Sequence, residues 1–534
     1  MSESEKITLF DTTLRDGAQT RDVHFSVEDK IKLTKELDEM GFEYIEGGWP
    51  GSNPKDIQFF ERMKSIPLKY SRLSSFSSTR LKDTEPEKDR ILAELVKAET
   101  PVFTIFGKSW DLHVYESLGT TLQENLNMIY STIEYLKPLG DEVVYDAEHF
   151  FDGFKVNPEY AIKTIQAAAE AGSDWIVLAD TNGGAFPEDI RKGTKAAMAS
   201  VDKPIGIHTH NDGDLSLANT LVAVELGAKM VQGTINGLGE RCGNTNLCSV
   251  IPALSLKLGY TTLKPDKIST LTQLSRLVSE LSNKPHQENL PYVGKGAFTH
   301  KGGIHVSAVN KNPKLYEHLP PEVIGNERHT SISDQAGKSN ILRKVKELGM
   351  KVDDSHAKAI VAEVKDLEAK GYHFEGADAS FELLSEALTG QRKQHFTVHG
   401  FRVHSWENER GEIWSEATIK LSVPESVAGD GGHQSTFEHT VGEGVGPVAA
   451  MDRALHKCLE KFYPSISDIR LTDYKVRILD EEAGTTAITR VLITSTDGRR
   501  HWGTVGVSES IIEASWRALV ESLEYKIKKD DEEA

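Results

Sequence analysis

Two histidines separated by one residue are the first candidates for chemistry in this sequence. His208 and His210 end an apolar run that is predicted to form a strand. Side chains two residues apart on a strand point to the same face, so both imidazoles would project together. A divalent ion could bind one nitrogen from each, with a carboxylate oxygen of Asp16 and the side chain of Asn244 as further ligands. Two histidines with oxygen donors and open positions suit Mn²⁺, Zn²⁺, Co²⁺ or Mg²⁺.

Three further polar residues have the chemistry to act on a substrate of such an ion. A metal with open positions can bind a 2-oxo acid through its ketone and carboxylate oxygens and polarise the carbonyl. Arg15 could neutralise the alkoxide that develops when a carbanion attacks, Glu148 could take a proton from the attacking methyl group, and Thr181 could hold the substrate carboxylate. The alternatives are structural: Glu148 as a solvated or ion-paired carboxylate, and Arg15 as half of a surface ion pair.

Elements able to position these residues alternate regularly in the first half of the chain. Strand-like runs occupy residues 6–10, 42–49, 70–76, 101–108, 142–148, 175–180, 204–210 and 230–235. Amphipathic helical stretches between them include residues 26–40, 121–137, 158–171, 187–200 and 214–226. Eight strand–helix units in about 250 residues are typical of a TIM (β/α)8 barrel, with a doubly wound sheet as the alternative.

A barrel would bring the candidate residues to one rim. Catalytic side chains of this fold lie at the carboxyl ends of the strands. The candidates follow or end the first, fifth, sixth, seventh and eighth predicted strands: Arg15 and Asp16, Glu148, Thr181, His208 and His210, and Asn244. A random scatter of surface charge would not give this placement.

Composition limits the remaining classes of protein. The 534 residues include 62 Lys and Arg against 81 Asp and Glu, a net charge of −19, which argues against nonspecific binding to nucleic acid or anionic membranes. Three cysteines at these spacings indicate neither a disulfide framework nor a zinc knuckle, and we expect Cys242 to pack inside. No apolar run approaches the roughly 18 residues of a membrane span. The polar, acidic start is unlike a signal peptide, so we expect a cytoplasmic protein.

The second half of the chain is organised differently. Residues 260–390 are mainly helical around a glycine-rich stretch at 294–305, and we expect this connector to lend residues to the barrel mouth. Strand-like runs return at residues 396–405, 417–423, 469–478, 488–495 and 500–507. Here the triplet Thr-Val-Gly occurs at 440–442 and 504–506, and each copy precedes a helical stretch, 448–462 and 511–525. We expect the charged residues 526–534 to fray.

This internal repeat predicts a duplicated α+β module. Such a module could hold an effector between its copies, or could serve only to pair subunits. The predicted domains are therefore a catalytic barrel at 1–270, a helical connector at 271–390 and a regulatory, dimerisation and effector-binding domain at 391–534.

Three motifs carry a resemblance to a known family. DTTLRDG at 11–17, HTHND at 208–212 and GLGERCGN at 237–244 resemble the metal-dependent acyltransferase and lyase barrels. These include 2-isopropylmalate, homocitrate and citramalate synthases and hydroxymethylglutaryl-CoA lyase; the duplicated module resembles the regulatory domain of the isopropylmalate and citramalate enzymes, which the lyases lack. The resemblance implies Asp16, His208, His210 and Asn244 as metal ligands, Arg15 as the catalytic arginine, Glu148 as base, and His305 and Tyr316 assisting on acetyl-CoA.

Segments 46–56 and 310–313 are most similar to the (R)-citramalate synthase branch. That branch implies condensation of acetyl-CoA with pyruvate in isoleucine biosynthesis, isoleucine as effector and a homodimer. Trp49 and Phe106 follow barrel strands and could fill the space that a larger 2-oxo acid needs, although they could also be ordinary core residues. The alternatives are a 2-isopropylmalate synthase acting on 2-oxoisovalerate and a non-catalytic amino-acid-binding regulator.

Overall fold

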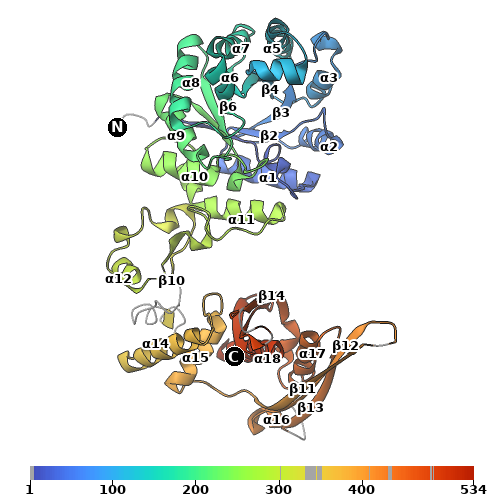
Figure 1. Cartoon of the computed structure of the whole chain (residues 1–534), viewed down its shortest axis with the longest axis vertical. Coiled ribbons are helices and arrows are strands. Elements are labelled where there is room, and N and C mark those ends of the chain that lie inside the picture. Colours follow the sequence, from blue (N-terminus) through green and yellow to red (C-terminus); the bar gives the residue numbers. More distant parts are fainter. Residues whose placement is uncertain are drawn as a thin grey trace. The chain divides into compact units, whose positions relative to one another are not determined.

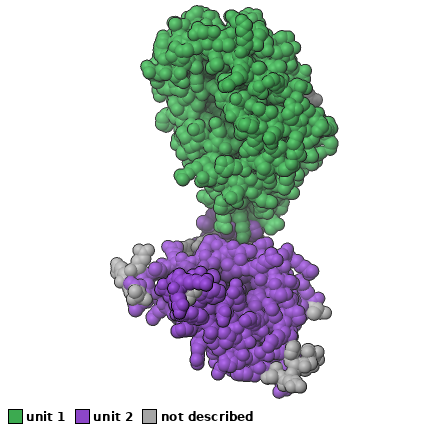
Figure 2. All heavy atoms as spheres, turned by 90° about the vertical axis from the view of Figure 1, so that its right-hand side faces the viewer, with its two compact units in different colours: residues 1–298, 319–328 green, residues 299–318, 329–534 purple. Residues whose placement is uncertain are grey.

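A computed structural model describes residues 5–300, 302–330, 344–345, 352–407, 409–430, 436–480, 484 and 486–533. The chain divides into two compact units, coloured separately in Figure 2. Unit 1 comprises Met1–Phe298 and Leu319–Arg328, and unit 2 comprises Thr299–His318 and His329–Ala534. Each unit thus takes part of the stretch 271–390, and the division into three domains stays a prediction.

Unit 1 contains a closed barrel of eight parallel strands (Figure 1). Each strand pairs with the next along the chain, and β1 pairs with β8 to close the ring. The strands are β1 Thr8–Asp11, β2 Tyr44–Gly48, β3 Arg72–Ser78, β4 Val102–Lys108, β5 Glu142–Glu148, β6 Trp175–Asp180, β7 Ile205–Thr209 and β8 Met230–Gly233. The predicted TIM barrel is confirmed.

Helices follow the strands and cover the outside of the barrel (Figure 1). They are α1 Val27–Met40, α2 Pro54–Met63, α3 Arg90–Lys97, α4 Asp111–His113, α5 Leu122–Leu136, α6 Phe150–Val156, α7 Pro158–Glu170, α8 Pro187–Ser200, α9 Ser216–Leu226, α10 Leu247–Pro252 and α11 Leu271–Leu281. Short 3-10 or π turns include η1 Gly17–Gln19 and η4 Ile235–Gly237. Helix α1 starts with the capping box of Ser26 and Asp29 and ends at Gly41, whose φ of 89° suits a residue without Cβ.

The inside of the barrel is apolar at depth and polar toward the carboxyl ends of the strands. An inner cluster joins Phe10, Tyr44, Val102, Val144, Val177 and Met230. Two residues further along their strands, on the same face, lie Glu46, Asp146 and Gln232. Residues two apart on a strand share a face, so the polar layer lies directly above the apolar layer inside the barrel. Along the described residues, no helix is long and apolar enough to cross a membrane.

Unit 2 contains two antiparallel sheets of three strands each. Their strands are β11 Thr397–Glu407, β12 Ile413–Ser422 and β13 Phe437–Gly444 in one, and β14 Arg470–Ile478, β15 Thr489–Thr496 and β16 His501–Ser508 in the other. The other helices and strands of its described residues include β9 Thr299–His300, α12 Gly303–Lys311, β10 His329–Thr330, α14 Asp354–Ala369, α15 Asp378–Thr389, α16 Glu425–Asp430, α17 Pro447–Leu459 and α18 Ile511–Glu533. The predicted α+β module after a helical stretch is confirmed.

The internal repeat has a structural meaning in unit 2. A Cβ added to Gly442 would come within 2.5 Å of the backbone nitrogen of Ala454, and one added to Gly506 within 2.0 Å of the carbonyl oxygen of Ala514. The glycine of each Thr-Val-Gly copy therefore lets a helix, α17 or α18, lie directly on its strand. In each copy one arginine of the helix donates to a carbonyl of that strand region: Arg453 to Glu443, and Arg517 to Val507.

The expectation that residues 526–534 fray is wrong. Helix α18 continues to Glu533. Lys526 and Lys528 are buried there and pair with carboxylates, Lys526 with Asp497 and Asp530, and Lys528 with Glu382. A run of charge looks solvent-exposed in a sequence, but here Asp497 and Glu382 from other parts of unit 2 pair with it.

Candidate active site

Asp16, His208 and His210 meet at the carboxyl end of the barrel, and we refer to them as the His-Asp cluster. The two Nε2 atoms are 3.3 Å apart, and they lie 3.5 Å (His208) and 3.9 Å (His210) from Oδ2 of Asp16. All three side chains are buried. The amide of Asn244 donates to Asp16 Oδ2 over 3.1 Å and lies 3.3 Å from His208 Nε2. The sequence-predicted ligands are thus brought together.

The donor set fits a divalent ion. Metal bonds to nitrogen and oxygen of about 2.0–2.2 Å place neighbouring ligand atoms about 3 to 3.5 Å apart. Oδ1 of Asp16 and Oδ1 of Asn244 are buried and have no hydrogen-bond partner among the described residues. Buried oxygen atoms are rarely left unpaired, so these two are suited to a cation. The described part of the chain therefore contains a group that could hold a metal ion.

Local structure explains how the cluster forms. Asp16 immediately precedes η1, in the turn that follows β1. His208 lies on β7 and His210 follows it, so the two-residue period turns both rings inward. The glycine-rich loop after β8 returns to β7 through a bridge between His210 and Asn244, and Asn211 donates to the carbonyl of Gly243. That bridge brings Asn244 to the two imidazoles.

Arg15 is held on three sides. Its Nε donates to Oε2 of Glu46 over 2.6 Å, its Nη1 lies 3.1 Å from Asp16 Oδ2, and its guanidinium carbon stands 3.8 Å above the ring of Phe76. Burial alone would raise the pKa of Asp16, but Arg15 and the two histidines lower it well below its ordinary value. Burial raises the pKa of Glu46 despite Arg15. The guanidinium is therefore a fixed positive charge beside the cluster.

A chain of side chains orients His208 from behind. Its Nδ1 lies 2.9 Å from Oε1 of Gln232, whose Nε2 donates to Oδ1 of Asp146 over 2.9 Å. The amide oxygen accepts a hydrogen bond, so it holds the proton of His208 on Nδ1 and leaves the Nε2 lone pair directed at the His-Asp cluster. Burial, with the charge of Glu46, raises the pKa of Asp146 to about 7.

A cavity of about 190 Å³ opens in front of the His-Asp cluster, and we call it the acceptor cavity. Its lining includes the remaining candidates of unit 1: Arg15, Trp49, Phe106, Glu148 and Thr181. Glu148 pairs with Lys108, which stands opposite it in the register of β4 and β5. The Thr181 hydroxyl oxygen accepts from the backbone N–H of His149 over 2.8 Å, which leaves its own proton available to a ligand.

Aromatic rings form one wall of the acceptor cavity. The indole of Trp49 lies edge-on to Phe76 and to Phe106, with ring centroids 5.7 Å apart in both pairs, and Phe76 and Phe106 stack at 5.2 Å. Such pairs favour one fixed arrangement, so the wall is stiff. It limits the room for an apolar substrate group beside the cluster.

His305 and Tyr316 belong to unit 2, whereas the acceptor cavity belongs to unit 1. Within unit 2 their rings are 4.3 Å apart, and both side chains are exposed. Their assignment to acetyl-CoA stays a prediction.

Three residues of the site had no assigned role in the sequence analysis: Glu46, Asp146 and Gln232. Each lies on the inward face of a barrel strand, and Asp146 precedes Glu148 by two residues. That spacing was a usable signal, because acidic residues two apart on a strand share a face. Gln232 gave no such signal, since its partners come from β5 and β7.

The expectation that Cys242 packs inside is wrong, because Cys242 is exposed. The loop around it contains four residues with positive φ, Gly237, Gly239, Arg241 and Gly243. It borders a second cavity of about 800 Å³ beside the same rim.

Comparison with known proteins agrees with this architecture. The HMGL-like family model matches residues 6–278, the model for the homocitrate synthase post-HMGL domain-like family matches 292–372, and the model for the LeuA allosteric (dimerisation) domain matches 375–527. The (R)-citramalate synthase of Aquifex aeolicus is 52% identical over 99% of this chain and 99% of its own. That of Geobacter sulfurreducens is 50% identical over 98% of both chains. The chain belongs to the (R)-citramalate synthase family.

Relatives named 2-isopropylmalate synthase are less similar to this chain. A 2-isopropylmalate synthase of Sulfolobus acidocaldarius is 33% identical over 70% of this chain and 94% of its own. The resemblance inferred from the three motifs is therefore confirmed, including its (R)-citramalate synthase branch.

Proposed function

We propose that the protein condenses acetyl-CoA with pyruvate and water to give (R)-citramalate and CoA. The observation that carries this proposal is the meeting of the His-Asp cluster, Arg15 and Glu148 around one small cavity. A 2-oxo acid needs a Lewis acid at its ketone, a cation for the developing oxygen charge and a base for the attacking methyl group. The acceptor cavity offers groups of all three kinds.

Asp16, His208 and His210 would hold a divalent ion, with Asn244 as a further ligand. Bound there, such an ion would supply Lewis-acid polarisation of the pyruvate carbonyl. The donors are imidazole nitrogens and carboxylate or amide oxygens, which suit Mn²⁺, Mg²⁺, Zn²⁺ or Co²⁺.

The protein's own side chains would carry the proton and charge transfers. Glu148 takes a proton from the methyl group of acetyl-CoA, and the resulting carbanion forms a carbon–carbon bond to C2 of pyruvate. Negative charge moves to the former ketone oxygen, beside the Arg15 guanidinium that Glu46 and Phe76 hold in place. This oxygen then takes up a proton to become the hydroxyl group, which balances the proton that Glu148 removed and returns to solvent. The free proton of Thr181 is available to the pyruvate carboxylate. Water then cleaves the thioester, which releases CoA, and His305 and Tyr316 would assist on the acetyl-CoA side.

The aromatic wall supports pyruvate as the acceptor. Trp49, Phe76 and Phe106 crowd the acceptor cavity beside Arg15. A methyl group needs less room than an isopropyl group, and each extra methylene is worth about 1–3 kcal/mol in a fitted apolar pocket. A small cavity therefore favours pyruvate over 2-oxoisovalerate.

Release of CoA with a panel of 2-oxo acids tests the proposal. The full-length protein with added Mn²⁺ should release CoA fastest with pyruvate, more slowly with 2-oxobutanoate and slowest with 2-oxoisovalerate. Chelation of the metal should abolish the activity, and readdition should restore it. Faster turnover of 2-oxoisovalerate would make the protein a 2-isopropylmalate synthase, and absence of turnover with every acid would favour a binding protein.

We also propose that unit 2 pairs two subunits and binds isoleucine as a feedback inhibitor. The match of residues 375–527 to an allosteric (dimerisation) domain supports this role. That region contains two similar strand–helix units, and such a duplication suits both an effector and a partner copy.

A further inference from the structure

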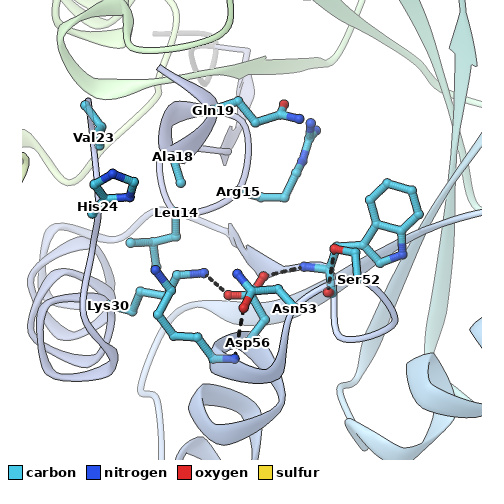
Figure 3. A pocket seen from close by; sticks show the side chains of 12 residues that line it. Leu14, Arg15, Ala18, Gln19, Val23, His24, Lys30, Ser52, Asn53 and Asp56 are labelled. Atoms are coloured by element: carbon cyan, nitrogen blue, oxygen red, sulfur yellow. Dashed lines mark hydrogen bonds and ion pairs between the residues drawn. The ribbon is translucent and has the colours of Figure 1, made fainter. Parts of the chain in front are cut away.

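A buried ion pair of Lys30 and Asp56 holds the backbone of Trp49, and the proposed chemistry does not use this pair. Asp56, in the first turn of α2, accepts a hydrogen bond from the backbone N–H of Trp49 on Oδ2 over 3.0 Å. Its other oxygen accepts from Nζ of Lys30 on α1 over 2.5 Å. The same ammonium donates to the carbonyl of Gly47 over 2.8 Å. Figure 3 shows Lys30 and Asp56 directed toward each other, with Asn53 beside Asp56.

The loop is shaped to the carboxylate. Gly48 has φ of 151°, and a Cβ there would lie 2.4 Å from Oδ2 of Asp56. A Cβ on Gly47 would meet the rings of Phe59 and Phe60 at 2.4 and 2.9 Å. The end of β2 therefore lies directly on α2. The hydrogen bond to Asp56 fixes the position of the backbone of the next residue, Trp49.

Lys30 is an unusual residue for this position. Its side chain is only 2% exposed, and its neighbours include the ring of Phe59. Burying an ammonium group is costly unless it is paired and hydrogen-bonded, and removing one member of such a pair is strongly destabilising. An apolar residue would fill the space without this cost. Because the Lys30 ammonium contacts both Asp56 and the carbonyl of Gly47, the pair can instead fix the position of the chain there.

Trp49 connects the Lys30–Asp56 pair to the acceptor cavity, because its backbone binds Asp56 and its indole lines the cavity. Its indole touches Phe76 and Phe106 edge-on, and all three rings line the cavity in front of the His-Asp cluster. Trp49 also lines a cavity of about 220 Å³ that borders Lys30 and Asp56, drawn in Figure 3. The backbone anchor and the aromatic wall therefore meet at one residue.

We propose that Lys30 and Asp56 are positioning residues that fix Trp49 and thereby set the largest acceptor that the cavity admits. Lys30 orients the carboxylate, Asp56 holds the Trp49 amide, and the indole limits the space for the side chain of the 2-oxo acid. The choice of acceptor as readout rests on the proposed function, whereas the hydrogen bond to the Trp49 amide does not.

Two double variants separate positioning from general stability. Lys30→Met with Asp56→Asn removes both charges but keeps an oxygen that accepts from the Trp49 amide. Lys30→Met with Asp56→Leu removes the charges and the acceptor. The two proteins differ only in the anchor of Trp49, and Trp49→Phe serves as a reference for a changed wall.

Two measurements on the full-length variants give the result. Hydrogen–deuterium exchange of the peptide containing Trp49 should be about tenfold faster in the Leu variant than in the Asn variant. The ratio of kcat/KM for 2-oxobutanoate to that for pyruvate should rise about fivefold in the Leu variant, mainly through KM for pyruvate, and stay within about twofold of wild type in the Asn variant.

Equal exchange at Trp49 in the two folded double variants would overturn the proposal, whatever the enzyme's substrate is. Faster exchange with an unchanged acceptor ratio would overturn its link to selectivity. If the wild-type protein turned over no 2-oxo acid, the proposed function would fail, and the exchange measurement would still decide whether Asp56 anchors Trp49.

Discussion

Gln232 shows how a single neutral side chain can orient a proposed metal ligand. Its amide accepts from Nδ1 of His208 and donates to Asp146, and both contacts are 2.9 Å long. An amide that did only one of these things could rotate freely. Because it does both, the tautomer of His208 and the direction of its Nε2 are fixed before an ion arrives.

Replacement of Gln232 by leucine should weaken metal binding about 10–100-fold, because residues behind metal ligands typically contribute that much. Titration calorimetry of metal-free, full-length protein with Mn²⁺ measures the effect. Gln166→Leu is the control, since among the described residues the Gln166 amide donates to the carbonyl of Ser200, away from the His-Asp cluster. Unchanged affinity in a folded Gln232→Leu protein would show that His208 is oriented by other means.

Glu521 gives unit 2 a pH-dependent stability. Burial raises its pKa from 4.5 to about 7, against the hydrogen bond from Ser380. A carboxyl with a raised folded pKa binds its proton more tightly in the folded state. The contribution of Glu521 to the free energy of unfolding is therefore largest below pH 4.5, falls as the pH rises from there to about 7, and is then constant.

Glu521→Gln should remove this loss, since the amide stays neutral and can still accept from Ser380. We expect the variant to be more stable than wild type at pH 8 by up to about 3 kcal/mol, and equal to it near pH 4.5. Calorimetric unfolding at the two pH values measures this, with Glu509→Gln at an exposed position as control. A stability difference that is the same at both values would contradict the assignment.

Residue patterns predicted the members of the His-Asp cluster but not the side chains behind them. His208 and His210 could be found because two-residue spacing on a strand determines a shared face. Gln232 and Asp146 are 86 residues apart, and neither has a local spacing to the other. Their contact depends on the closure of the barrel, which a strand-by-strand interpretation does not describe.

At the scale of elements, periodicity predicted all eight barrel strands, and their ends were less well determined. The third was expected at residues 70–76 and runs from Arg72 to Ser78. Its last residues are Ser77 and Ser78, and the register with β4 extends the strand through them. Polar residues at the rim of a barrel are part of a strand when their backbone pairs with a neighbouring strand. This pairing cannot be predicted from the type of side chain.

The repeated glycines of unit 2 allow a matched test of helix–strand packing. Gly506→Ala places a methyl group against the carbonyl of Ala514, so we expect a loss of about 1–3 kcal/mol in the unfolding free energy of unit 2. Gly400→Ala, in β11, is the control because a Cβ there meets nothing within 4 Å. Calorimetry of the two full-length variants compares them; similar stabilities would mean that α18 can shift away from β16 at little cost.

At the scale of the whole molecule, the boundary expected near residue 390 divides a shared core. Phe374 and Phe381 pack with Val505 and Val507 of β16 in one cluster. A protein that ends at residue 390 would expose these rings. The sequence could not reveal this, because the helices of the connector and the strand that covers them are more than a hundred residues apart. Regulation is therefore better studied in the complete chain.

Isoleucine should inhibit release of CoA by the complete chain, because residues 375–527 match an allosteric domain. Initial rates with saturating pyruvate, at increasing isoleucine, measure the effect. Leucine and valine at equal concentrations are the controls, and we expect weaker inhibition by both. Equal rates with and without isoleucine would leave unit 2 with a role in subunit pairing alone.

The two copies in unit 2 also share one interior. Phe401 of the first sheet stacks on Trp516 of the second helix at 4.3 Å, and a single apolar cluster includes residues of α17 and α18. Joined on one chain, the copies meet at an effective concentration set by the linker, not by the amount of protein in the cell. Dilution can separate one subunit from another, but it cannot separate these halves. If the two copies were separate molecules, their shared apolar core would form only at sufficient protein concentration. Because they lie on one chain, this core forms at any concentration.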